Sequence, residues 1–131
     1  MIFMLLKVAG LDHLPEHVLN DWALEPSQIW QAGDESPSGE PYADTGFNLT
    51  LPNHESWVDA LVHLEGFLED KTEMFHELIG IGAEMQLHVG VSILTGDTVS
   101  PPLEFSRPLL ADLVSREINL SILVFEPEEK T

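Results

Sequence analysis

The segment His13-Leu14-Pro15-Glu16-His17 is the best match to a catalytic motif, because it fits the His-x-x-Glu-His pattern of inverted zinc peptidases. That chemistry needs both histidines on one helical face, a turn apart, with the glutamate activating a metal-bound water. Pro15 favours a helix start between the two histidines, which leaves His13 outside the helix. We therefore expect a capping residue and an exposed histidine here, with no metal and no cofactor.

A second candidate site is the polar face of the strand predicted over Met85–Ile93, where His88 is the titratable group. Polar residues of the last predicted strand extend this face if the two strands are neighbours, and Asn48 and Thr50 could also contribute. A sheet covered by helices on one side exposes its other side, most often to water. As an alternative to water, we consider a small ligand or substrate bound by Gln86, His88, Asn119 and Ser121.

Acidic residues dominate the composition, with 23 Asp and Glu against 5 Lys and Arg and a formal net charge of −18. Such a chain repels nucleic acid and anionic membranes, so a macromolecular partner is expected to be a basic protein. The carboxylate pairs at helical spacing look uniformly exposed, whereas catalytic carboxylates need environments that separate their pKa values. We therefore expect a binding protein rather than an enzyme.

Two groups of acids are the predicted docking residues for such a partner. The first lies in a long surface loop over Gln31–Thr45, rich in Gly, Pro, Ser and acid, which we call the acidic loop. The second lies on the polar face of the longest predicted helix, and we call it the helix acids. The loop residues are Asp34, Glu35, Glu40 and Asp44, and the helix acids are Glu65, Glu69 and Glu73.

The length and composition indicate one domain over residues 1–131, with a polar tail over 126–131 that we expect to fray. The apolar fraction of 44% is that of a folded protein, either a monomer or a small homo-oligomer. The absence of cysteine excludes disulfides and thiolate chemistry. The apolar segment Met1–Gly10 lacks a basic flank and is too short to span a bilayer, so it is interpreted as a buried strand of a cytoplasmic protein.

Alternating apolar residues predict further strands over Phe47–Leu51, Met85–Ile93 and Ile118–Val124, with a brief extended piece at Ser27–Trp30. Apolar residues at three-and-four spacing predict a short helix after Pro15, a long helix from Trp57 to Ile79, and a third helix capped by Ser106. A turn is expected at Thr95–Pro102. This order predicts an α+β two-layer sandwich: one mostly antiparallel sheet with three helices on one face.

The chain resembles the domain-of-unknown-function 4279 family over most of its length. The resemblance runs from Pro15 through Leu24-Glu25-Pro26, Trp30, Gly33-Asp34-Glu35 and Tyr42, and continues through the long helix, Gly82-Ala83-Glu84 and the Leu109–Val124 ending. Its most specific part is the Leu-x-Pro…Trp-x-x-Gly pattern, and Phe47 stands where that family has tryptophan. The resemblance implies an α/β fold in a bacterial cytoplasmic protein and supplies no catalytic residues. It also implies an immunity role beside a toxin gene, in agreement with the charge.

Three functional hypotheses follow. The first is a non-enzymatic protein-binding module, such as an immunity protein or inhibitor of a basic partner, which presents carboxylates to that partner. The second is a small-molecule-binding or enzymatic domain that uses the polar sheet face around His88. The third is that the acidity serves solubility alone.

Overall fold

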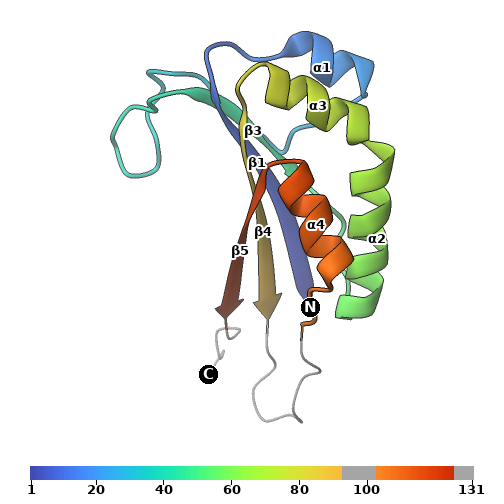
Figure 1. Ribbon diagram of the computed structural model, residues 1–131. Coiled ribbons are helices and arrows are strands. Elements are labelled where there is room, and N and C mark those ends of the chain that lie inside the picture. Colours follow the sequence, from blue (N-terminus) through green and yellow to red (C-terminus); the bar gives the residue numbers. More distant parts are fainter. Residues whose placement is uncertain (93–102, 126–131) are drawn as a thin grey trace, which may run out of the picture.

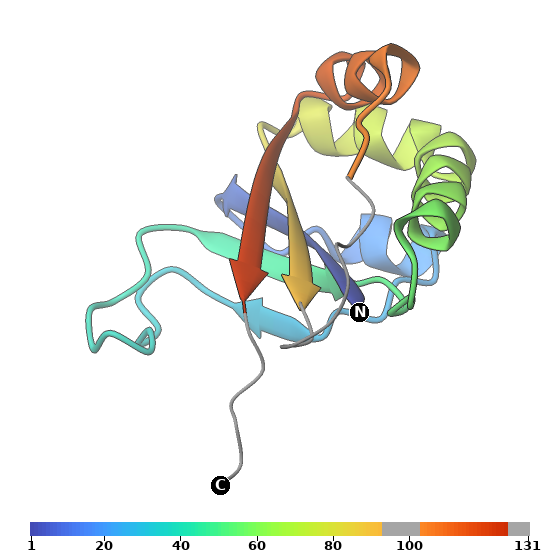
Figure 2. The same ribbon diagram turned by 90° about the horizontal axis from the view of Figure 1, so that it is seen from below.

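The computed structural model describes residues 1–92 and 103–125, and the predicted turn at Thr95–Pro102 and tail at 126–131 lie outside them. Within these ranges the chain forms one five-stranded sheet in the order β2-β3-β1-β4-β5, with its helices on one face (Figures 1 and 2). This confirms the predicted α+β class. The strands are β1 (Ile2–Leu11), β2 (Gln28–Trp30), β3 (Thr45–Thr50), β4 (Glu84–Ser92) and β5 (Ile118–Phe125).

The sheet is mostly antiparallel, as predicted, with one parallel pair. Strand β1 lies in the centre and pairs antiparallel with both β3 and β4, while β2 pairs antiparallel with β3. Strands β4 and β5 are parallel, and the chain between them passes through a helix. A parallel pair needs such a crossover, whereas antiparallel neighbours do not.

In residues 1–92 and 103–125 four helices cover the sheet, because the long helix predicted as one element is divided in two. The helices are α1 (Glu16–Asp21), α2 (Trp57–Asp70), α3 (Thr72–Gly80) and α4 (Arg107–Ser115). The long helix predicted from Trp57 is divided at Lys71, because two side chains bond to the last carbonyls of α2. The Thr72 hydroxyl donates to the carbonyl oxygens of Leu68 and Glu69 at 3.2 and 2.8 Å, and Arg116 Nε donates to that of Leu68 at 3.2 Å.

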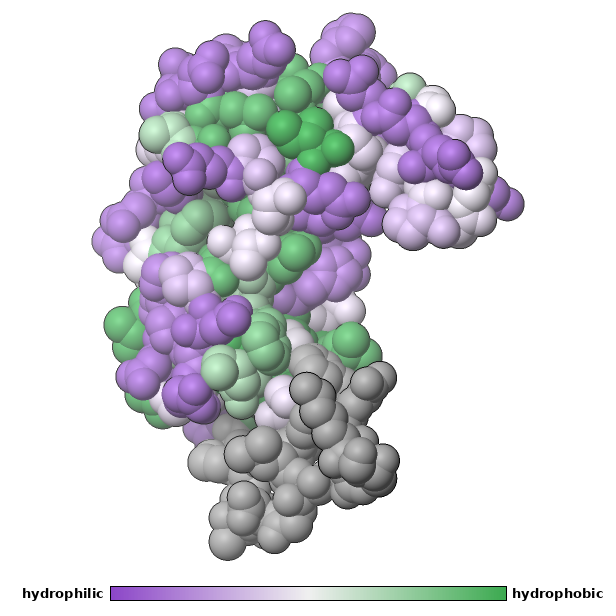
Figure 3. Space-filling view, turned by 180° about the vertical axis from the view of Figure 1, so that it is seen from behind, coloured by the Kyte–Doolittle hydropathy of each residue, from purple (hydrophilic) through white to green (hydrophobic). Residues whose placement is uncertain are grey.

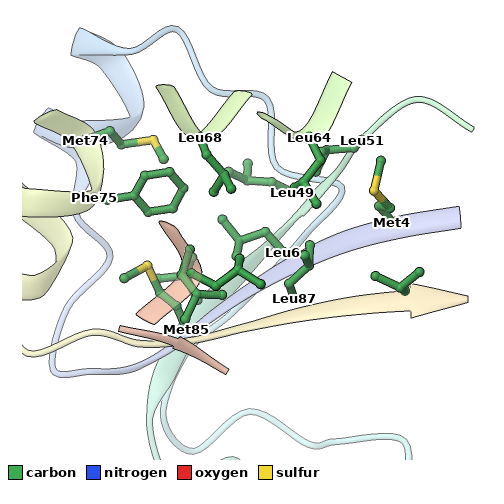
Figure 4. Packing of buried hydrophobic residues seen from close by; sticks show 14 of the residues in the cluster. Met4, Leu6, Leu49, Leu51, Leu64, Leu68, Met74, Phe75, Met85 and Leu87 are labelled. Carbon is green, nitrogen blue, oxygen red and sulfur yellow. The ribbon is translucent and has the colours of Figure 1, made fainter. Parts of the chain in front are cut away.

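The core lies between the sheet and the helices. Alternate residues of the central strands point toward α2 and α3, as Figure 4 shows for Met4, Leu6 and Leu87, which meet Leu64, Leu68 and Phe75. All six side chains are at most 2% exposed. Serines cap two of these helices: the Ser56 hydroxyl accepts from Asp59 N in α2, and the hydroxyl of Ser106, the predicted cap, accepts from Leu109 N in α4.

Candidate functional site

The acidic loop is folded as an extension of the β2–β3 hairpin. Gly33 N donates to the Tyr42 carbonyl at 2.9 Å, and Tyr42 N donates back to the Asp34 carbonyl at 2.8 Å. The Asp34 side chain accepts from Gln31 N at 2.9 Å, and the Thr45 hydroxyl accepts from Ala32 N at 3.1 Å. The loop is therefore held in one conformation by its own bonds, and Figure 3 shows it as a hydrophilic projection from the molecule.

An aromatic stack attaches the loop to the sheet. The ring of Tyr42 lies on that of Trp30, with centroids 5.4 Å apart and planes 24° apart. Trp30 is 5% exposed and lies over Gly46 of β3, while Lys7 Nζ lies 5.7 Å from its ring centroid. Trp30 thus packs as a buried anchor beneath the loop.

A hollow of about 400 Å³ lies between the loop and the edge strand β2. Its walls combine apolar surface from Ile29 and Tyr42 with carboxylates from Asp34 and Glu35. The ion pairs of the described residues, Glu73–His76 and Asp112–Arg116, involve none of the loop carboxylates. The hollow is therefore lined by two carboxylates and by no lysine or arginine of the described residues.

The helix acids do not lie near the loop. Glu65 and Glu69 belong to α2 and Glu73 to α3, and all three are exposed. Both ribbon views place the loop on one side of the molecule and α2 on the opposite side (Figures 1 and 2). The two predicted docking groups are therefore separate surfaces, and other exposed acids lie on α1, α3 and the segments between elements, such as Glu16, Glu77 and Glu104.

The uncovered side of the sheet, which we call the open face, gathers the four predicted ligand-binding residues. Gln86 is opposite Asn119 and His88 is opposite Ser121 in the β4–β5 register. Residues directly opposite each other on neighbouring strands point to the same side of the sheet. Following the pairing across the sheet therefore gives three rows of side chains on the open face, two of which contain these pairs. The rows are Gln28–Asn48–Lys7–Gln86–Asn119, then Thr50–Leu5–His88–Ser121, then Phe3–Gly90–Leu123.

These three rows contain no carboxylate, although the chain carries 23 acidic residues. They carry one lysine and one histidine among neutral polar and apolar side chains. A hollow of about 390 Å³ lies over the second and third rows, with His88, Thr50 and Ser121 as polar lining and Phe3 and Leu5 as apolar lining. The open face can thus accept an uncharged or amphipathic group.

Sequence reasoning missed the contribution of β1 to this face. Phe3 and Leu5 are half-buried and Lys7 is exposed, so β1 is buried on one side only. The sequence does carry a sign of this, because Phe3, Leu5 and Lys7 alternate with the buried Ile2, Met4 and Leu6. The length of the apolar run favoured a buried strand, so its second face was not included in the candidate site.

The histidine motif of the N-terminal segment lacks metal-site geometry. Helix α1 begins at Glu16, after His13, and both His13 and His17 are exposed. No group of three or more His, Asp or Glu in residues 1–92 and 103–125 could hold a metal ion. In these ranges, no helix is long and apolar enough to cross a membrane.

No family model matches the chain, and comparison with curated proteins and with solved structures finds no similar protein. The resemblance to the domain-of-unknown-function 4279 family therefore stays a prediction that rests on the residues given above.

Proposed function

We propose that this chain is a non-enzymatic binding protein that recognises a basic protein through its acidic loop, in the manner of an inhibitor or immunity protein. The observation that supports this most is the hollow beside β2, where Asp34 and Glu35 stand next to Ile29 and Tyr42. A lysine or arginine side chain matches such a hollow, because its aliphatic stem packs on apolar surface while its charged end bonds to carboxylates.

The fixed conformation of the acidic loop also supports this proposal. The backbone bonds at Gly33 and Tyr42 and the stack on Trp30 fix the loop before any partner arrives. Binding then costs little loop entropy, so more of the contact energy remains as affinity. The helix acids, on the other side of the molecule, contribute only to long-range attraction.

Because the acidic loop and the helix acids lie on opposite sides of the molecule, each group can be neutralised separately in a matched pair of variants. The loop variant carries Asp34→Asn, Glu35→Gln and Glu40→Gln, and the helix variant carries Glu65→Gln, Glu69→Gln and Glu73→Gln. Each removes three carboxylates, so the two have the same net charge. Three direct charge contacts at about 0.5–1 kcal/mol each predict that the loop variant binds about 10- to 100-fold more weakly, and the helix variant less than about 3-fold more weakly.

The experiment uses the wild type and both variants as baits in lysate of the source organism, washed at low and then high salt. We expect one basic protein on the wild-type and helix-variant baits, released by salt, and its loss from the loop variant. Equal loss from both variants, or from neither, contradicts docking through the loop. An absence of any salt-released partner supports the hypothesis that the acidity serves solubility alone.

A second candidate function is the binding of a small molecule on the open face, which the carboxylate-free hollow around His88 favours. Titration of a fragment library into ¹⁵N-labelled protein tests it. The candidate predicts amide shift changes at Leu5, His88 and Ser121 that His88→Ala abolishes. Changes confined to the acidic loop, or none, contradict it.

A further inference from the structure

Strand β5 (Ile118–Phe125) is an edge strand that lacks the usual protection against pairing. Among residues 1–92 and 103–125 it pairs with β4 only, so its other side presents backbone donors and acceptors. Natural edge strands are commonly short, or carry charges, prolines or bulges that prevent pairing with another chain. The eight residues INLSILVF contain no charge and no proline, and their register with β4 runs without a shift.

The opposite edge of the same sheet is protected. Strand β2 has only three residues, it lies just after Pro26, and the acidic loop continues directly from its end. A short strand and nearby charges both discourage pairing with another chain. The two edges therefore differ in kind, and β5 is the edge that is open to a further strand.

Large apolar side chains are exposed on both sides of β5 in its second half. Ile122 and Val124 are 46% and 56% exposed on the side of the helices, and Leu123 is 65% exposed on the open face. A strand added beside β5 would cover part of all three, and the burial of apolar surface is favourable. A segment that fits this edge is therefore apolar opposite these residues.

Acidic residues flank β5 in the sequence at both ends. Glu117 is exposed directly before the strand, and the residues that follow Phe125 are EPEEKT, with three glutamates and one lysine. Arg116, which precedes Glu117, does not offset these charges, because its side chain is 12% exposed and pairs with Asp112. An uncharged strand between acids, in a chain of net charge −18, repels a second copy and attracts a cationic segment.

We propose that β5 binds an extended segment of a basic protein as a further strand of the sheet. Apolar residues of this segment lie opposite Ile122, Leu123 and Val124, and lysine or arginine residues at its ends meet the acids that flank β5. Backbone hydrogen bonds supply affinity when a strand adds to a free sheet edge, and the side chains supply selectivity. This surface is separate from the acidic loop, and the proposal does not depend on the partner of that loop.

Synthetic peptides that differ in charge or in their ability to form a strand are the probes. The first, Lys-Lys-Val-Thr-Val-Thr-Val-Lys-Lys, alternates apolar and polar residues between basic ends. In the second, glutamate replaces every lysine, so the backbone can pair but the ends are repelled. In the third, proline replaces the central valine, which keeps the charge of the first peptide but interrupts a strand.

Titration of each peptide into the ¹⁵N-labelled full chain tests the proposal. We expect the first peptide to shift the amides of β5 with a Kd below about 1 mM, and the other two to bind at least about 10-fold more weakly. Equal affinity of the first peptide and either of the others overturns the proposal. So does the absence of shifts in β5 up to about 1 mM of the first peptide, or their confinement to the acidic loop.

A matched pair of variants locates the site on the protein. Leu123→Lys places a cation on the edge strand, and Val114→Lys makes the same change of charge on α4, where Val114 is 74% exposed. We expect Leu123→Lys to bind the first peptide at least about 10-fold more weakly, and Val114→Lys less than about 3-fold more weakly. Equal losses in these two variants contradict binding at β5.

The loop variant separates this proposal from docking through the acidic loop. It should bind the first peptide within about 3-fold of the wild type, because β5 is unchanged in it. A loss in the loop variant as large as that in Leu123→Lys would place the peptide on the acidic loop and overturn the proposal. Loss of the captured basic protein from the loop variant, by contrast, tests the proposed function alone.

Discussion

The packing of Trp30 over Gly46 can be tested by the substitution Gly46→Ala, which adds a single methyl group between two strands. An added Cβ would collide with the Val8 carbonyl oxygen and the Trp30 ring, whose Cε2 atom would lie 2.9 Å away. The carbonyl belongs to the central strand β1 and cannot move without disturbing the sheet. The indole must therefore move, and Tyr42 and the acidic loop must move with it.

The expected cost follows from the contacts that would be lost. Overpacking of a close-packed site costs about 1–3 kcal/mol. Displacing Trp30 also disrupts its stack on Tyr42, worth about 0.5–1.5 kcal/mol, and its contact with Lys7, worth about 0.5–1 kcal/mol. We predict that the free energy of unfolding falls by about 2–5 kcal/mol, a large part of the 5–15 kcal/mol of a typical domain.

Urea unfolding followed by tryptophan fluorescence and circular dichroism measures this loss. With a slope of about 2 kcal/mol per M, the midpoint should fall by about 1–2.5 M, with altered native fluorescence. The control is Gly66→Ala in α2, where nothing lies within 4 Å of an added Cβ, and which should raise stability by about 0.5–1 kcal/mol. A loss below about 1 kcal/mol for Gly46→Ala, or unchanged native fluorescence, would refute the described packing.

Three further substitutions probe the helical layer by the same urea assay. Phe75→Ala should cost about 3–5 kcal/mol, because Phe75 is fully buried and packs edge-on against Phe67, and a cost below about 2 kcal/mol would contradict that burial. Ser56→Ala removes the cap of α2 and should cost about 1 kcal/mol, whereas an unchanged midpoint would mean that the cap contributes nothing. Arg116→Met removes the hydrogen bonds to Leu68 and Thr72 and should cost about 1.5–3 kcal/mol, while the exposed Arg107→Met should stay within about 0.5 kcal/mol of the wild type.

Periodicity in the sequence predicted most elements, because burial on one side imposes a period that the residues display. The alternation in Met85–Ile93 predicted β4 (Glu84–Ser92), and Ile93 lies outside the described residues. Ser106 and Pro108 predicted the start of α4, where proline occupies the tolerated first turn. These signals are local, so the sequence alone carries them.

Features that depend on distant contacts could not be predicted in the same way. At the division of the long helix, the Leu68 carbonyl accepts a hydrogen bond from Arg116, which lies 48 residues further along the chain. The strand order with β1 in the centre also follows from long-range pairing rather than from any local pattern. A weak sign of the division was present, since Lys71 and Thr72 interrupt the apolar stripe between Leu68 and Phe75.

For the candidate site too, the sequence predicted the local groups of residues but not how they are placed relative to one another. The sequence located both acidic groups, and the topology then placed them on opposite sides of the molecule. Asn119 and Ser121 were expected beside Gln86 and His88 if their strands were neighbours, and the parallel pairing of β4 and β5 meets that condition. The absence of carboxylates from the three rows around His88 was not foreseen, because these rows emerge only when alternate residues of all five strands are brought into register.

The most direct test of the proposed function is the affinity of the captured basic partner for the wild type, the loop variant and the helix variant, measured by calorimetry at low and high salt. We predict a Kd that rises steeply with salt for the wild type, a loss of about 10- to 100-fold for the loop variant, and a loss below about 3-fold for the helix variant. Equal affinities of the two variants would contradict recognition through the acidic loop.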